Sequence, residues 1–131
     1  MTAPDPGGRA GVDRIRVVLA TPGDAEDRAT GTVARGLRDA GMEVVHAGRA
    51  TLEQLADTVV QEDADAVGLP ALLADAAAIA RLTALLEGRG AADVVVFACG
   101  VDAGLPGLGR TFPAGTAPAE IAGWLRGRLG G

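Results

Sequence analysis

The sequence contains no lysine or tyrosine and has few aromatic, cysteine and histidine residues. Its 131 residues include 2 Phe, 1 Trp, 1 Cys and 1 His. So few aromatic side chains argue against a protein that binds nucleic acid by stacking on its bases. All 12 basic residues are Arg and form no basic run, and the net charge is −5, so neither nucleic acid nor an anionic membrane surface is an expected partner. A single cysteine excludes a disulfide framework and a cysteine-rich metal site.

Long apolar runs are also missing. No run approaches the about 20 residues that span a bilayer. Residues 1–12 are polar and rich in Pro and Gly, and they lack the apolar segment of a secretory signal. We therefore expect a soluble cytoplasmic protein with a disordered tail at residues 1–12 and one domain at residues 13–131.

Apolar strands and amphipathic helices alternate along the chain. Continuous aliphatic runs predict strands at residues 15–20, 42–46, 64–69 and 94–98, and a very short one at 111–112. Helical spacing of apolar residues predicts helices at about 27–40, 51–62 and 75–87, and from Pro118 onward. Five strands separated by helices predict an α/β fold with a doubly wound, flavodoxin-like (Rossmann-like) parallel sheet, in the order 2-1-3-4-5.

Three details of these helices can be tested. Thr51 and Gln54 form a capping-box pattern that should begin the second helix. The first helix should bury one face, made of Ala29, Val33, Leu37 and Ala40. Trp124 is expected to anchor the last helix by packing.

In a doubly wound sheet, ligands lie at the carboxyl ends of the strands, near the switch in strand order. That rule gathers the loops that follow each strand, at residues 21–26, 46–50, 70–73, 99–109 and 112–116. The loop after the first strand holds Asp24, Glu26 and Asp27, directly before a helix. We expect the ligand site to be built from these loops.

Four motifs in these loops carry a family resemblance: Asp24-Ala25-Glu26-Asp27-Arg28-Ala29, Pro70-Ala71-Leu72, Cys99-Gly100 and Phe112-Pro113-Ala114-Gly115-Thr116. With them, residues 14–129 resemble the cobalamin (vitamin B12)-binding domain of acyl-CoA mutases of the methylmalonyl-CoA mutase kind. The resemblance implies that the following residues bind the cofactor: Asp24, Glu26, Asp27, Arg28, Pro70, Leu72, Cys99, Gly100, Phe112, Gly115 and Thr116.

The motifs depart from the family at the residues closest to the cofactor. The family's first loop reads Asp-x-His-x-x-Gly, and its His binds cobalt in place of the cofactor's own base. Here Glu26 replaces that His, and corrin cobalt prefers an imidazole nitrogen to a carboxylate. Ala29 replaces the Gly, and Pro70 offers no hydroxyl where the family has Ser. We therefore expect cobalamin (adenosylcobalamin) binding to be base-on, weak or absent.

The resemblance implies a subunit that is not catalytic alone. It would act with a large acyl-CoA mutase barrel subunit that holds the CoA ester. The alternative is a cofactor-free, degenerate domain that serves as a structural or regulatory protein-interaction module. A small independent enzyme using Asp24 or Glu26 is a third hypothesis, but no nucleophile–base pair or metal cluster supports it.

Some residues have both a structural and a functional interpretation. Asp27 is a candidate helix N-cap, so the loop carboxylates need no catalytic role. His46 at the end of the second strand could replace the missing ligand, although a lone His is more often a surface residue. Cys99 after a buried strand is by default an unreactive thiol, because no neighbouring base is visible. The glycine-rich run at residues 103–109 could bind phosphate, but it precedes no helix directly.

Overall fold

The computed structural model describes residues 14–21, 28–101 and 108–129, with the side chain of Leu72 excepted. The expected tail at residues 1–12 lies outside these ranges. The division of the chain into a tail and a domain therefore stays a prediction.

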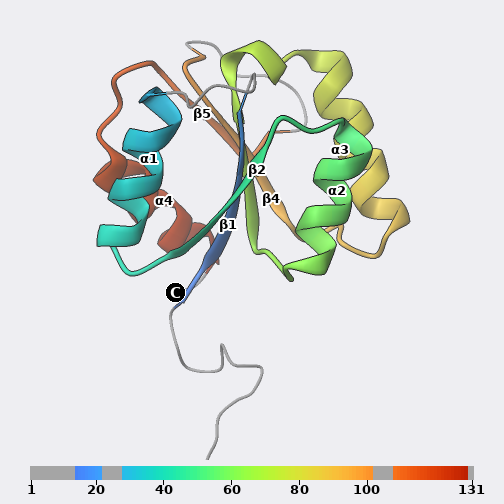
Figure 1. Ribbon diagram of the computed structural model, residues 1–131, viewed down its shortest axis with the longest axis horizontal. Coiled ribbons are helices and arrows are strands. Elements are labelled where there is room, and N and C mark those ends of the chain that lie inside the picture. The colour runs from blue at the N-terminus through green and yellow to red at the C-terminus, as the bar shows by residue number, and fades with distance from the viewer. Residues whose placement is uncertain (1–13, 22–27, 102–107, 130–131) are drawn as a thin grey trace, which may run out of the picture.

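One sheet of five parallel strands forms the centre of the molecule (Figure 1). Its order, β2-β1-β3-β4-β5, confirms the predicted flavodoxin-like topology. From β1 the chain passes to β2 on one side and then crosses to β3 on the other. This reversal places a topological switch point at the carboxyl ends of β1 and β3. The strands are β1 (Arg16–Ala20), β2 (Glu43–Gly48), β3 (Ala66–Pro70), β4 (Val95–Cys99) and β5 (Arg110–Phe112).

Two pairs of helices cover the two faces of the sheet (Figure 1). One face carries α1 (Arg28–Asp39) and α4 (Pro118–Leu129), and the other carries α2 (Leu52–Gln61) and α3 (Ala76–Gly88). Successive strand residues point to opposite faces, so each strand contributes to both cores. In β1, for example, Val17 packs toward α1 and α4, whereas Val18 packs toward α2 and α3. Within the described ranges, no helix has both the length and the apolar character needed to cross a membrane.

The ends of three strands differ from the predicted ones. β2 continues past His46 to Gly48, whose positive φ of 68° suits glycine and turns the chain. Pro70 was expected to follow β3 but is its last residue, a position where a missing N–H is tolerated. Cys99 was expected in a loop but ends β4, opposite Pro70. A 3₁₀ turn, η1 (Ala71–Leu73), follows β3 and was not expected.

The start of α2 confirms the capping box. The Thr51 hydroxyl accepts a hydrogen bond from the Gln54 N–H at 3.0 Å, and the Gln54 side chain accepts one from the Thr51 N–H at 2.9 Å. Both bonds satisfy N–H groups that a helix leaves unpaired at its start. Trp124 is likewise half-buried against the core beneath α4, as expected.

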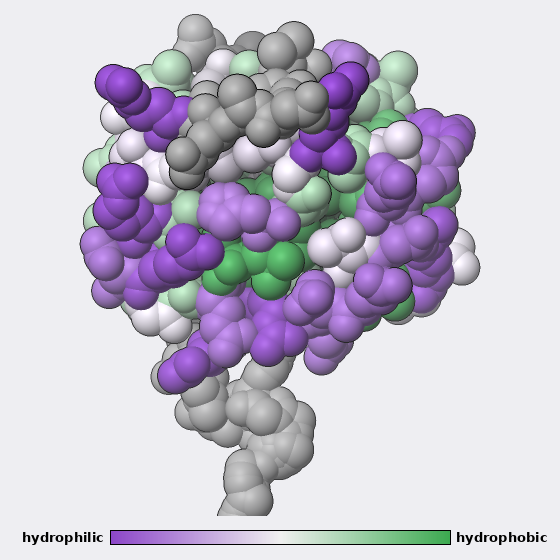
Figure 2. Space-filling model, in the orientation of Figure 1, coloured by the Kyte–Doolittle hydropathy of each residue, from purple (hydrophilic) through white to green (hydrophobic). Residues whose placement is uncertain are grey.

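The outer edge of β2 is protected against pairing with a second sheet. None of its six residues is fully buried, and the apolar surface along it is narrow and flanked by hydrophilic residues (Figure 2). An Arg38 guanidinium N–H donates to the exposed Val44 carbonyl at 3.3 Å. Charged side chains at an edge strand discourage pairing with a second sheet.

An ion pair joins β1 and β2 at the amino end of the sheet, opposite the expected ligand site. Arg16 Nε donates to Glu43 Oε1 at 2.7 Å, and Arg16 also bonds the Glu62 carbonyl at the end of α2. The hydrogen bond from Arg16 lowers the pKa of the Glu43 carboxyl from its ordinary value. The pair therefore ties two strands and one helix together.

Because the pKa of Glu43 is lower in the folded state, the pair stabilises the protein above the unfolded pKa, and this contribution is lost as the pH falls through the folded value. Glu43→Gln is expected to reduce the loss of unfolding free energy between about pH 7 and about pH 3. Urea denaturation at both pH values measures this loss. Glu87→Gln, on an exposed turn of α3, is the matched control; an equal reduction in both variants would contradict the assignment.

Candidate functional site

A pocket of about 720 Å³ opens at the carboxyl edge of the sheet. It lies on the face covered by α1 and α4, between the ends of β1, β3 and β4, the first turns of α1 and the segment 112–116. Its volume is in the range of pockets for small ligands and cofactors, about 300–1,000 Å³. The pocket therefore lies at the switch point where a doubly wound sheet binds its ligand.

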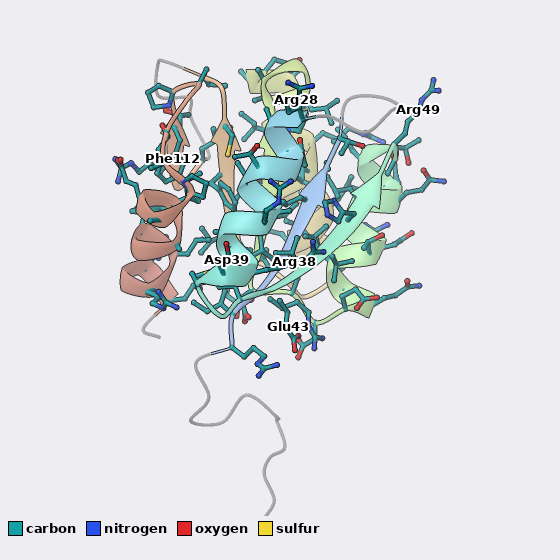
Figure 3. The ribbon with its side chains drawn as sticks, turned by 60° about the vertical axis from the view of Figure 1, so that its left-hand side comes forward. Arg28, Arg38, Asp39, Glu43, Arg49 and Phe112 are labelled. Carbon is teal, nitrogen blue, oxygen red and sulfur yellow. The ribbon has the colours of Figure 1, made fainter. Side chains whose placement is uncertain are left out.

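Seven of the eleven predicted site residues line this pocket. Arg28 comes from the first turn of α1 and Phe112 from the end of β5, and Figure 3 shows both on neighbouring elements. The structure thus brings together four segments that are far apart in the sequence. The role of these residues in binding a cofactor stays a prediction. The seven are Arg28, Pro70, Cys99, Gly100, Phe112, Gly115 and Thr116.

The other four predicted residues are not placed at the pocket by the structure. Asp24, Glu26 and Asp27 lie outside the described residues, as does the N-cap expected at Asp27. The backbone of Leu72 belongs to η1, next to the pocket residue Ala71, but its side chain is not described. The glycine-rich run also lies largely outside the described ranges, because residues 102–107 are not part of them.

His46 does not belong to the pocket. Its side chain is exposed in β2, the edge strand, and it is absent from the pocket lining. As it is the only histidine of the chain, no imidazole is available at the described part of the site. The interpretation of His46 as a surface residue agrees with this position.

Several apolar residues that line the pocket were not predicted from the sequence. Ala29 and Val33 were assigned to the packed face of α1, but Ala29 is exposed, Val33 is half-buried, and both line the pocket. The same helix face becomes fully buried only further along, at Leu37. The signal that could have revealed the pocket is Gly68, a residue without a side chain in an otherwise aliphatic strand.

Gly68 lines the pocket, and its missing side chain leaves room for two neighbouring side chains. A Cβ at this position would lie 2.7 Å from the Phe97 ring and 2.8 Å from Leu19 Cδ2. The Phe97 ring, fully buried, therefore occupies the space above Gly68. That ring also meets Phe112 and Trp124 edge to face, with centroids 6.2 Å and 6.4 Å away. The three aromatic rings of the chain thus form one aromatic cluster, of which Phe112 lines the pocket.

The described lining of the pocket is mainly apolar, and its polar groups are engaged or exposed. The Thr116 hydroxyl donates to the Pro113 carbonyl at 2.6 Å. Burial raises the pKa of the Cys99 thiol to about 11, so the thiol is protonated at neutral pH. A protonated thiol is neither a nucleophile nor a metal ligand. Among the described residues, no group of three His, Cys, Asp or Glu side chains could hold a metal ion.

Comparison with known proteins identifies two similar mutase subunits. The chain is 43% identical over 90 residues to the small subunit of 2-hydroxyisobutanoyl-CoA mutase from Aquincola tertiaricarbonis, an alignment that covers 66% of each protein, just under two thirds. It is 31% identical over 121 residues to the small subunit of pivalyl-CoA mutase from Xanthobacter autotrophicus, covering 86% of this chain and 82% of that one. No family model matches the sequence.

Solved structures show the same fold at low sequence identity. A cobalamin-binding protein from Desulfitobacterium hafniense has a TM-score of 0.69 and 21% identity, over 88% of this chain and 59% of that one. A CheY-like protein from Pseudomonas aeruginosa has a TM-score of 0.61 and 22% identity, over 90% and 95% of the two chains. These likenesses establish the flavodoxin-like architecture. From its sequence similarity over most of its length, the chain belongs to the family of acyl-CoA mutase small subunits.

Proposed function

We propose that the chain binds cobalamin and inserts the nucleotide tail of the cofactor, with its benzimidazole base, into the pocket. The observation that carries this proposal is the pocket itself: it is lined by seven of the eleven residues that the family resemblance assigns to cobalamin binding. Its mainly apolar lining suits a flat aromatic base, which gains from burial.

The mode of cobalamin binding follows from placing the benzimidazole base in the pocket. A base that enters the pocket must leave the cobalt, so we expect a base-off corrinoid. This differs from the base-on mode that Glu26 favours, in which the tail would not use the pocket. Cobalt would then receive no nitrogen ligand from this chain, since its only histidine, His46, lies on the edge strand. Binding is therefore expected to be weaker than a histidine ligand would allow.

The division of labour between subunits is part of the same proposal. Cobalamin supplies radical chemistry when it is bound. The residues of this chain bind the tail, exclude water from it and present the corrin at the carboxyl edge of the sheet. A separate large mutase subunit, with a barrel that holds an acyl-CoA, would carry the substrate chemistry. We place this assembly in the cytoplasm.

Titration with hydroxocobalamin tests the proposal. We expect saturable binding by equilibrium dialysis and a change from the base-on to the base-off corrin spectrum. Val33→Phe should weaken binding by at least about tenfold, because the larger ring fills the pocket beside α1. Val44→Phe is the matched control, since Val44 is also half-buried against the same core but lies in β2, outside the pocket.

Three results would separate the alternatives. Binding with an unchanged base-on spectrum would support the mode expected from Glu26 and would exclude the inserted tail. No binding, either alone or with a large mutase subunit, would overturn the cobalamin proposal. If the chain then still captured that subunit, the cofactor-free interaction module would be the better description.

A further inference from the structure

We propose that the pocket selects among corrinoids by the lower base of their nucleotide tail, and that it favours an apolar aromatic base without ring nitrogens, such as a phenol. This inference rests on the proposed function, because it requires the tail to enter the pocket. It goes further in naming the class of corrinoid that the chain holds best.

The first argument is the shortage of available side-chain hydrogen-bond donors in the described lining. The Thr116 hydroxyl and N–H both donate to the Pro113 carbonyl, at 2.6 Å and 3.1 Å. The Gly100 N–H donates to the Phe112 carbonyl at 2.7 Å. Thr30 makes a further interaction of its own. These donors of the described lining are thus already engaged.

The side-chain donors that remain in the described lining are weak or are exposed to water. Arg28 and Thr32 are exposed, so a base in the pocket would have to compete with water for their hydrogen bonds. The Cys99 thiol is protonated, but S–H is a weak donor. A ring nitrogen that enters this pocket therefore loses its hydrogen bonds to water and finds no strong side-chain donor in the described lining. An unpaired buried acceptor is unfavourable.

The second argument concerns the cobalt. A benzimidazole that moves into the pocket gives up its bond to cobalt. His46, the only histidine, is exposed on β2 and does not line the pocket. No imidazole of this chain replaces the lost bond. A phenol-type lower base has no nitrogen to coordinate cobalt, so it enters the pocket without this loss.

Both arguments favour the same corrinoid. We expect the phenol-type corrinoid to bind at least about tenfold more tightly than cobalamin, which is the effect of one unpaired buried acceptor. Cobinamide, which lacks the nucleotide and its base, should bind more weakly than either. Equilibrium dialysis of the full chain against these three corrinoids, each with cyanide as upper ligand, measures the order through the corrin absorbance.

The variants Val33→Phe and Val44→Phe locate the selectivity. In Val33→Phe, the two corrinoids with a tail should fall to the affinity of cobinamide, because the pocket is filled. In Val44→Phe, the order should remain that of the original chain. Circular dichroism checks that both variants fold, and Ala29→Phe, at an exposed position of the same pocket, replaces Val33→Phe if that variant does not.

The outcomes distinguish this inference from the function on which it rests. Equal affinities for cobalamin and the phenol-type corrinoid would overturn the selectivity but leave cobalamin binding standing. So would cobinamide binding as tightly as both, because the tail would then contribute nothing. A preference that survives Val33→Phe would place the selectivity outside the pocket. Binding of none of the three would overturn both proposals.

Discussion

Gly36→Ala is expected to destabilise the protein by about 2–3 kcal/mol, although alanine is the better helix former. A Cβ at Gly36, in the middle of α1, would lie 2.1 Å from Cβ and 2.8 Å from Cγ of Pro118. The proline ring is rigid and begins α4, so only a shift of one whole helix can relieve the overlap. Thermal unfolding followed by circular dichroism should show a fall in Tm of roughly 8 °C or more.

Gly31 provides a matched control in the same helix. Its Cβ would meet nothing within 4 Å. Gly31→Ala is therefore expected to stabilise the protein by about 0.5–1 kcal/mol, since it restricts the unfolded chain without a clash. If both variants shifted Tm in the same direction, the close approach of α1 and α4 would not be what requires glycine at position 36.

Gly68→Ala is expected to weaken hydroxocobalamin binding by at least about tenfold and to destabilise the fold by about 1–3 kcal/mol. The new methyl would lie 2.7–2.9 Å from atoms of Phe97 and Leu19. Phe97 is held by Phe112 and Trp124, so Leu19, which lines the pocket, is pushed into it. Equilibrium dialysis measures the affinity and urea denaturation the stability.

The binding loss must be separated from the general loss of stability. Ile79→Val removes a methylene group from the core on the opposite face and should cost about 0.5–1.5 kcal/mol. At a temperature where both variants are folded, Ile79→Val should bind hydroxocobalamin like the original chain. If Gly68→Ala also bound hydroxocobalamin like the original chain, Gly68 would have no role in binding.

The sheet and its order could be predicted because the local signals agree with one another. Continuous aliphatic strands, a capping box at Thr51 and glycines after helices all indicate alternating β and α units. The right-handed crossover rule then leaves few topologies. Element ends were less certain, since Pro70 and Cys99 pair within the sheet for reasons of register that a local pattern does not contain.

The site was predictable where it depends on topology and not where it depends on packing. The rule for parallel sheets brings Pro70, Cys99 and Phe112 to one edge from the order of strands and helices alone. The pocket between them could not be foreseen, because it depends on Ala29 and Val33 of α1 lining a cavity rather than being fully buried in the core. An apolar residue at helical spacing has the same pattern whether it faces a core or a cavity.

The aromatic cluster of Phe97, Phe112 and Trp124 gives the protein an intrinsic fluorescent reporter. Trp124 is the only tryptophan, and its ring lies 5.7 Å from that of Phe112, which lines the pocket. A corrin held at the carboxyl edge absorbs light in the region where indole emits, so occupancy of the pocket should quench Trp124 by energy transfer. Unfolding exposes the same indole to water and shifts its emission to longer wavelength. One side chain can therefore report separately on ligand and on fold, without any label.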